Sequence, residues 1–257
     1  MVTQQEPLTD TQYSLILNII EDRRKRKYDL REVIDAIFWL NRTGTQWRNL
    51  DRLFPKWQLV YYYYNKFIKK GIWEKINLAL IKHDRALQSK TDTPSLVSID
   101  SQSVKTVQFT HEEVGLDGNK KINGRKRHII VDTLGNIFCV VVHAAHHFDG
   151  IKGMGVWDKF INTIDTVKKV LADAGYKGQF KAHIEKLEYE IEISSRPPTE
   201  RGFVPIKKRW TVERTFSWFN FFRRLDKDHE KTVQSSEAMI YIAQIQILLN
   251  RNFKNTK

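Results

Sequence analysis

Two aspartates in this sequence each follow directly on an apolar, strand-like run, and this shared position predicts a shared chemical role. The run LVSI ends at Asp100 in SLVSIDSQSV, and the run VLA ends at Asp173 in KKVLADAGYKG. One such aspartate is common, because Asp often starts a turn or caps a helix. Two of them at the ends of two strands indicate paired carboxylates.

The elements around these aspartates predict a mixed α/β sheet. After the strand of Asp100, GRKRHIIVDTLGNIFCVVVHAAHH has the pattern of a hairpin that turns at residues 133–136. A helix (DGIKGMGVWDKFINTID), a strand (VKKVLAD), a helix (QFKAHIEKL) and a strand (YEIEIS) follow, and helices continue to the end. In this order the first and fourth strands can be parallel neighbours, about 4.8 Å apart. Asp100 and Asp173 would then share one sheet edge.

Carboxylates that share a cation suit phosphodiester chemistry. In such sites two metal ions, about 3.5–4 Å apart, activate the attacking oxygen and stabilise the leaving oxygen. Ligands that are mostly Asp and Glu oxygens select hard cations such as Mg²⁺ or Mn²⁺.

Glu213, in RWTVERTFSWFNFFRRLDKDHE, is the best candidate for a third acid. On a helix it shares one stripe with Ser217, Asn220 and Arg224. The rest of that helix is so aromatic that it is expected to be largely buried, and a buried acid needs a partner or a metal. The alternative partners are the guanidinium groups of Arg209 and Arg214.

Other side chains compete for a place in the site. Asp132 stands beside the hairpin turn and suits turn chemistry, and Asp149 suits a cap of the helix that follows it. His143, His146 and His147 cluster at a strand end. They could bind a transition metal, form a polar strand end near DNA, or be partly buried.

Composition favours a nucleic-acid partner. Lys and Arg number 43 against 30 Asp and Glu in 257 residues, which gives a formal net charge of +13. The single cysteine, Cys139, excludes a disulfide within the chain and a Cys-based zinc site. The N-terminus MVTQQEPLTD is too polar for a signal peptide, and no apolar run approaches the roughly 18 residues of a membrane span. We therefore expect a soluble, cytoplasmic protein without a membrane partner.

Residues 8–90 have the pattern of several short helices. One is capped at Thr9 or Asp10, a second stops at Gly44, and two more are broken near Pro55 and Gly71. Basic residues interleaved with Trp and Tyr suit a helix-turn-helix type of DNA binder, and the alternative is a helical bundle with a solvated basic face. The polar stretch SKTDTPS resembles a linker. The predicted domains are therefore an all-α DNA-binding domain, 1–93, and a catalytic domain, 94–257.

The blocks described above, in this order, resemble a DDE transposase of a bacterial insertion sequence, of the insertion-sequence-five type, over nearly the whole chain. TGTQWRNLDRLFPKWQLVYYYYNKFIKKGIWEKI resembles the family's N-terminal module, and KKINGRKRHIIVDTLGNIFCVVVHAAHHFDG resembles its hairpin. SIDSQSVKT, LADAGYKGQF and RWTVERTFSWFNFFRRLDKDHE resemble the three catalytic blocks. The resemblance makes Asp100, Asp173 and Glu213 the catalytic, metal-holding residues. Ile206 and Asn220 depart from a related signature, which has Tyr and Lys there.

The resemblance implies an RNase H-like fold for the catalytic domain, and two Mg²⁺ (or Mn²⁺) ions per site. It implies cleavage of double-stranded DNA at terminal inverted repeats and transfer of the 3′-OH into target DNA. It also implies a homodimer on paired ends, in a bacterial cytoplasm and associated with the nucleoid. Two alternatives stay open: a nuclease of the same fold that cuts without joining, and a non-catalytic DNA-binding protein derived from a transposase.

Basic side chains are expected to hold the DNA backbone, which positions the DNA and makes binding fall with salt. The candidates near the catalytic residues are Lys105, Lys126, Arg127, Arg209, Arg223 and Arg224. Those beside the helical domain are Arg23, Arg24, Lys25, Arg26, Lys27 and Arg48.

Overall fold

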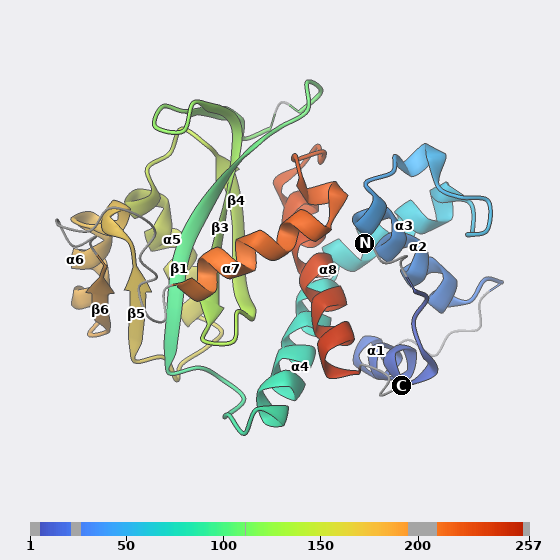
Figure 1. Cartoon of the computed structure of the whole chain (residues 1–257), viewed down its shortest axis with the longest axis horizontal. Helices are drawn as coiled ribbons and strands as arrows, with labels where there is room; N and C mark the ends of the chain where they lie inside the picture. Colours follow the sequence, from blue (N-terminus) through green and yellow to red (C-terminus); the bar gives the residue numbers. More distant parts are fainter. Residues whose placement is uncertain (1–5, 22–26, 111, 195–209, 254–257) are drawn as a thin grey trace. The chain divides into compact units, whose positions relative to one another are not determined.

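We describe the chain from a computed structural model, which covers residues 6–21, 27–110, 112–194 and 210–253. The chain forms two compact units (Figure 1). The first unit comprises residues 1–92, 219–227 and 234–257, and the second comprises 93–218 and 228–233. The sequence predicted a boundary at 93/94 but placed everything after it in one domain. The C-terminal helix instead groups with the N-terminal helices.

The first unit is helical. Its elements are α1 (Asp10–Ile20), α2 (Leu30–Thr43), η1 (Trp47–Asn49), α3 (Trp57–Lys69), α4 (Ile72–Leu87), η3 (Phe219–Phe221), η4 (Arg223–Leu225) and α8 (Val233–Asn252). Local chemistry fixes several ends, as predicted. The Thr9 side chain accepts a hydrogen bond from the Gln12 backbone and so caps α1, and Gly44, at φ +73°, ends α2 in the left-handed conformation.

The C-terminal helix α8 is a central element of this unit because it is buried on nearly all sides. Its polar side chains and carbonyl groups bind N-terminal helices. Asn41 donates to the carbonyl oxygen of Met239 (3.2 Å), and Gln246 donates to Asn41 (3.1 Å). The Tyr64 hydroxyl donates to the carbonyl oxygen of Ser235 (2.9 Å). These contacts explain why the helix departs from the sequence-predicted division.

The second unit is built on one mixed sheet. Its strands are β1 (Leu96–Lys105), β2 (Gly115–Asp117), β3 (Ile122–Asp132), β4 (Ile137–Ala144), β5 (Lys169–Ala172) and β6 (Glu190–Ile193). The order is β2-β3-β1-β5-β6, and β4 also pairs with β3. Strands β1, β3 and β4 are antiparallel, whereas β1, β5 and β6 are parallel. The predicted hairpin and the predicted parallel pair are both confirmed, and the short strand β2 was not expected.

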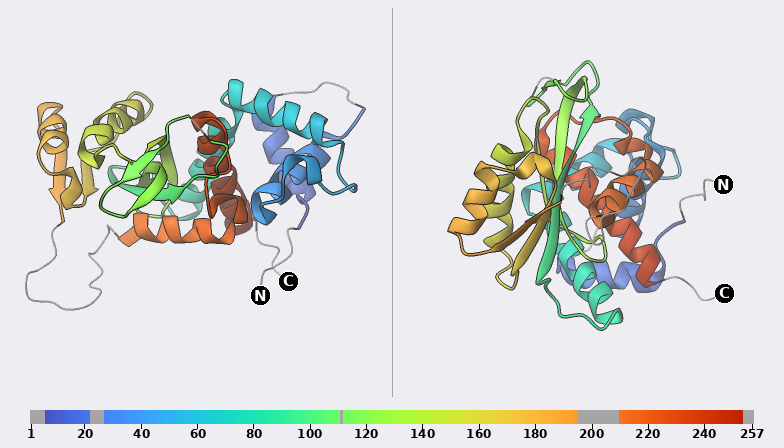
Figure 2. Two further views of the ribbon diagram at one scale, coloured as in Figure 1. Left: turned by 90° about the horizontal axis from the view of Figure 1, so that it is seen from above. Right: turned by 60° about the vertical axis from the view of Figure 1, so that its left-hand side comes forward.

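Helices cover both faces of this sheet (Figure 2). Helices α5 (Asp149–Ile161) and α6 (Gln179–Lys186) lie on one face, and α7 (Trp210–Trp218) lies across β1 and β3 on the other. The 3-10 turn η2 (Ala174–Tyr176) follows β5. Side chains on both faces of β3 are therefore buried. Nowhere in the described part of the chain is a helix both long and apolar enough to cross a membrane.

Candidate active site

Asp100 lies in the middle of β1, which continues to Lys105, so the strand end predicted at Asp100 is wrong, whereas Asp173 directly follows the neighbouring parallel strand β5 as predicted. Strand β1 pairs with β5 in the register Val97 to Val170 and Ser98 to Leu171, and the same offset, continued by two residues, sets Asp100 opposite Asp173. Asp173 lies just beyond β5, where its carboxylate accepts a hydrogen bond from the backbone N–H of Gly175 (2.8 Å). The strand thus ends in an Asx-type turn that directs the chain away from the sheet.

The phenol of Tyr176 faces the negative charge at this edge. Burial raises the pKa of Tyr176 well above its ordinary value, and the negative charges of Asp100, Asp149 and Asp173 raise that pKa further. Each of these carboxylates therefore acts on the same hydroxyl group. Tyr176 is fully buried and stays protonated.

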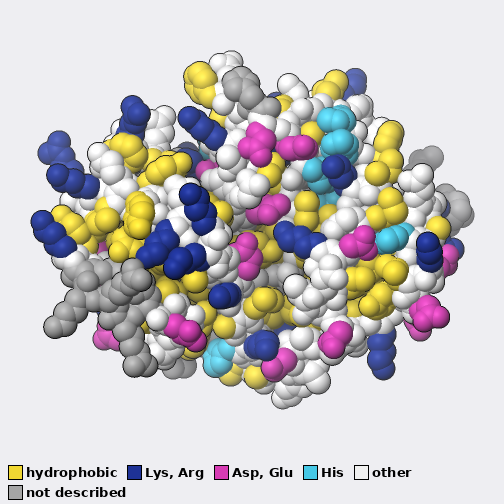
Figure 3. All heavy atoms as spheres, turned by 180° about the vertical axis from the view of Figure 1, so that it is seen from behind, with side chains coloured by type: hydrophobic (Ala, Val, Ile, Leu, Met, Phe, Trp, Pro, Cys, Tyr) yellow, Lys and Arg dark blue, Asp and Glu magenta, His cyan; other side chains and the backbone are white. Residues whose placement is uncertain are grey.

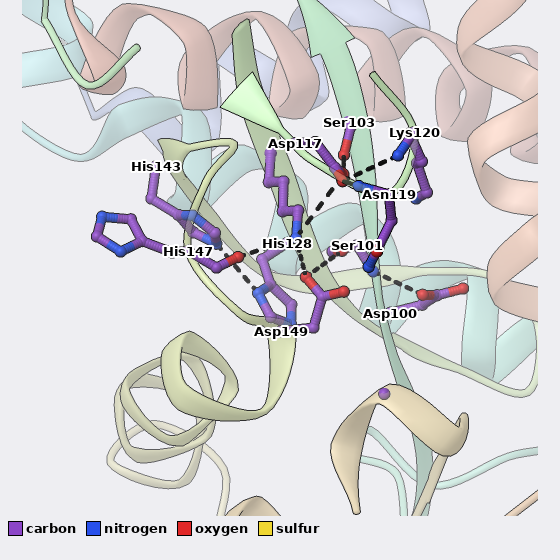
Figure 4. Close-up of polar contacts among 12 residues, drawn as sticks. Asp100, Ser101, Ser103, Asp117, Asn119, Lys120, His128, His143, His147 and Asp149 are labelled. Carbon is purple, nitrogen blue, oxygen red and sulfur yellow. Dashed lines mark hydrogen bonds and ion pairs between the residues drawn. The ribbon is translucent and has the colours of Figure 1, made fainter. Parts of the chain in front are cut away.

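Asp149, which the sequence predicted to be a helix cap, also lies at this edge of the sheet. It is the first residue of α5, and its Oδ1 accepts hydrogen bonds from Ser101 Oγ (2.7 Å) and Lys126 Nζ (2.9 Å) (Figure 4). Burial opposes ionisation, but these two hydrogen bonds and the charge of Lys126 outweigh it, so the pKa of Asp149 is lowered. Asp149 therefore ties α5 to both β1 and β3, beside Asp100.

Gly175 leaves room for two carboxylates. A Cβ built on it would lie 3.0 Å from Asp173 Oδ1 and 3.9 Å from Asp149 Oδ2. The second oxygen of Asp149 therefore points toward the turn that carries Asp173. The signal for Asp149 in the sequence resembled that for Asp173: an acid that follows a predicted strand and has a glycine one or two residues later.

Lys126 is an internal cation rather than a surface one. It is 6% exposed, and its Nζ donates to the carbonyl oxygen of His147 (2.9 Å) as well as to Asp149. It also lies 3.9 Å from Asp117, whose carboxylate accepts a hydrogen bond from Ser103 (2.5 Å). The network therefore connects β1, β2, β3 and the start of α5 (Figure 4).

One of the clustered histidines, His143, belongs to a buried hydrogen-bond chain that also contains His128. Tyr176 Oη lies 2.5 Å from His128 Nε2, His128 Nδ1 lies 3.3 Å from His143 Nε2, and His143 Nδ1 lies 3.0 Å from the carbonyl oxygen of Ala144. Because a carbonyl oxygen only accepts, His143 Nδ1 donates, so its Nε2 accepts from His128 and His128 Nε2 accepts from Tyr176. Burial lowers the pKa of His128 to about 3 and that of His143 to about 4. Both rings are neutral, and they support the sheet edge.

Glu213 lies half-buried on α7, the helix that crosses β1 and β3. Its neighbours fix the helix to the β3–β4 turn: Arg214 donates to the carbonyl oxygen of Leu134 (3.0 Å), and Thr215 donates to that of Gly135 (3.1 Å). The predicted stripe through Asn220 and Arg224 is wrong, because α7 ends at Trp218 and these residues lie in η3 and η4.

The described residues contain no group of three or more His, Cys, Asp or Glu side chains that could hold a metal ion. In this conformation Glu213 therefore does not complete a three-acid metal site with Asp100 and Asp173. The three histidines at 143, 146 and 147 do not form one either.

Comparison with known proteins shows the family. Residues 8–77 match a family described as "Putative transposase of IS4/5 family", and residues 91–249 match the family "Transposase DDE domain". The second match alone covers more than half of the chain. The chain belongs to the DDE-domain transposases. The resemblance to a DDE transposase is thereby confirmed, and the second unit has the mixed α/β sheet expected from the sequence.

Two other comparisons are less informative for this transposase. Among solved structures, it is similar to the catalytic core domain of BIV integrase, with 16% identity, coverage of 63% of this chain and 86% of that chain, and a TM-score of 0.37. No curated protein matches it.

The transposase's candidate phosphate contacts fall into three groups. The exposed ones are Lys27, Arg48, Lys105 and Arg223. The buried ones are Lys126, Arg127 and Arg224, which are 6%, 1% and 7% exposed. Arg23, Arg24, Lys25, Arg26 and Arg209 lie outside the described residues.

The buried group does not suit DNA contact in this conformation. Strand β3 is covered on both faces, so Lys126 and Arg127 are inside the fold, and Arg224 donates to the carbonyl oxygen of Thr45 (3.1 Å). The pattern of basic residues in the sequence does not distinguish these buried cations from exposed ones.

The donor set at the sheet edge fits a hard divalent cation, which transposases of this family typically use. Asp100 and Asp173 offer carboxylate oxygens at matched positions, and both residues are partly exposed. The buried Tyr176 beside them is neutral, whereas the nearby cation Lys126 forms an ion pair with Asp149. A cation would therefore offset the negative charge that remains.

Proposed function

We propose that this DDE transposase binds the terminal inverted repeats of an insertion sequence, cleaves the DNA at its ends and joins the 3′-OH to target DNA. The observation that carries the proposal is the parallel pairing of β1 with β5, whose register, continued by two residues past Leu171, would set Asp173 opposite Asp100. Two carboxylates held opposite each other on neighbouring parallel segments suit two-metal phosphoryl transfer.

Asp100, Asp173 and Glu213 would hold two Mg²⁺ or Mn²⁺ ions, which when bound activate the attacking oxygen and stabilise the leaving oxygen. In the first step water attacks phosphorus in line, and the DNA 3′-oxygen leaves as a hydroxyl. In the second step that 3′-OH attacks a phosphodiester of the target, and the target's own 3′-oxygen leaves.

The chain's other residues position these acids. Ser101, next to Asp100, is hydrogen-bonded to Asp149, and Asp149 is held by Lys126. This fixes the backbone of β1 at the reacting edge. Helix α7 already lies against β1. Glu213 on this helix would have to move toward Asp100 and Asp173 when DNA and the cations bind.

Residues 1–93 would supply DNA binding and residues 94–257 the catalytic residues, although α8 packs with the former. A homodimer would bring two DNA ends together. Lys105, Arg223, Lys27 and Arg48 are exposed and remain candidates for phosphate contacts.

The direct test incubates purified protein with a labelled duplex that ends in the element's own terminal repeat, with Mg²⁺ or with EDTA. Metal-dependent nicking at the repeat boundary is expected, and Asp100→Ala should not nick. A second target duplex in the same tube separates joining from cutting alone. A nuclease would release ends without forming a joined product.

A second candidate function is DNA binding without catalysis. The observation that favours it is the unassembled acid triad in the described residues. Sequence-selective binding with no cleavage under Mg²⁺ or Mn²⁺ would support this candidate and exclude the first.

A further inference from the structure

Helix α3 has two faces of opposite character. Val60, Tyr64 and Phe67 are each at most 1% exposed and form its inner face. At 100° per residue, Gln58, Tyr62, Asn65 and Lys69 lie on the opposite side of the helix. These four residues therefore form one continuous polar stripe that faces away from the core of the first unit, and we call it the outer stripe of α3.

The outer stripe borders a groove of about 760 Å³. Its lining consists of three lysines, two side-chain amides and two tyrosines, with no acid among them: Gln58, Tyr61, Tyr62, Asn65, Lys66, Lys69 and Lys70. Figure 3 shows basic side chains next to side chains of the hydrophobic class, which includes tyrosine, at the left of that view. Such a lining is complementary to a polyanion that also presents hydrogen-bonding base edges.

The groove is held in shape by its own contacts. The rings of Tyr61 and Tyr64 pack against Trp47, with centroids 5.0 and 4.9 Å from it. Asn65 Nδ2 donates to the carbonyl oxygen of Tyr61 (2.9 Å). This hydrogen bond orients the Asn65 amide, so that its Oδ1 points away from the Tyr61 carbonyl group. A preorganised polar face loses less conformational entropy on binding.

We propose that the outer stripe of α3 is a DNA-reading surface that lies in the major groove of the terminal repeat. An α-helix fits the major groove, and Gln and Asn side chains there recognise adenine through two hydrogen bonds. Gln58 and Asn65 would read bases, whereas Lys66, Lys69 and Lys70 would bind phosphates. The inference rests on the proposed function for the identity of the DNA, and it adds the surface that selects it.

The test uses a randomised library of DNA duplexes, so that the repeat sequence need not be known. Wild-type protein, Gln58→Ala/Asn65→Ala, Lys69→Gln/Lys70→Gln and the control Lys82→Gln each select from the library, and bound duplexes are sequenced. Lys82 is an exposed lysine of α4, in the same unit. Circular dichroism checks that every variant is folded.

The wild type should enrich a motif. The amide variant should lose about tenfold or more of the enrichment at each base position that it no longer reads, while its affinity for unselected duplexes is unchanged. The lysine variant should keep the motif but weaken binding to every duplex, with a salt slope smaller by about 0.9 for each lost phosphate contact. Lys82→Gln should behave as the wild type.

An unchanged motif in the amide variant would overturn the proposal, as would a wild type that enriches no motif or prefers single strands or RNA of the same length. These outcomes concern binding alone. They are separate from failure of the proposed function, which would appear as absent cleavage of a bound repeat.

Discussion

The acidic sheet edge and the outer stripe of α3 use the same kinds of side chain in opposite ways. Lys126 is buried at the edge with its ammonium group bound to Asp149 and to a backbone carbonyl oxygen, whereas Lys69 is exposed on the stripe. At the edge, polar groups bind one another and fix the carboxylates. On the stripe, they remain accessible to a partner. Burial, and not residue type, therefore distinguishes Lys126, which positions other residues, from Lys69, which is accessible to a partner.

Loss of an edge carboxylate should give the largest effect, and it should act on chemistry alone. Asp173→Asn removes a negative charge that would hold the cation, a contribution of several kcal/mol, so cleavage should fall about 10³-fold or more. DNA binding should be unchanged. Nicking of a labelled repeat is the measurement, and Asp165→Asn, an exposed aspartate on the loop before β5, is the matched control. Cleavage by Asp173→Asn within a few-fold of the wild type would remove Asp173 from the site.

The contrast between Lys126 and Lys69 can be tested by stability. Lys126→Met leaves the partly buried Asp149 carboxylate without its cation, and after allowance for its 28% exposed side chain this should cost about 2–3 kcal/mol of unfolding free energy. Lys69→Met should cost less than about 0.5 kcal/mol. Urea unfolding measures both. The double variant with Asp149→Asn should recover part of the loss, and equal effects of the two lysine variants would contradict the comparison.

The neutral histidines behind the edge predict a pH dependence. The pKa values of His128 and His143 in the fold, about 3 and about 4, lie below the ordinary value of about 6.5. Below pH 6.5 the unfolded chain therefore binds protons that the fold does not, so stability should decrease as pH falls from about 6.5 to 5. The slope is up to about 1.4 kcal/mol per pH unit for each histidine. The lowered pKa of His147, caused mainly by burial, adds in the same direction.

His143→Asn tests this dependence because it removes one titrating group and keeps, at the position of Nδ1, an amide nitrogen that can donate to the Ala144 carbonyl oxygen. Its unfolding free energy should vary less with pH than that of the wild type between pH 6.5 and 5. Identical slopes would show that His143 is not held neutral.

The smallest expected effect concerns the fine position of Asp173. In Gly175→Ala the new Cβ would lie 3.0 Å from Asp173 Oδ1, so the carboxylate must move by a few tenths of an ångström. Such a shift should lower the cleavage rate by about three- to tenfold. Gly155→Ala is the control, because a Cβ there meets nothing within 4 Å. Equal single-turnover rates for the two variants would show that the turn tolerates displacement.

Much of the sheet could be predicted from sequence because its signals are local. The strand end before Asp173, the hairpin turn at 133–136 and the stop of α2 at Gly44 each depend on a few neighbouring residues, whereas β1 continues past Asp100 to Lys105 because it pairs there with β3. The parallel pairing of β1 and β5 followed from element order, since crossover helices favour it. Asp149 was weighed only as a competitor, because its partners Ser101 and Lys126 are distant in the sequence.

The amino-acid sequence by itself determined the family, the β3–β4 hairpin and the parallel pairing of β1 with β5, because hydrophobic periodicity and turn chemistry depend on short stretches. The tertiary structure decided that Lys126 and Arg127 are internal, that α7 ends before Asn220, and that α8 packs with the N-terminal helices. These outcomes depend on which surfaces are covered by segments far away along the chain. Whether a charged side chain is buried is therefore decided by the tertiary structure.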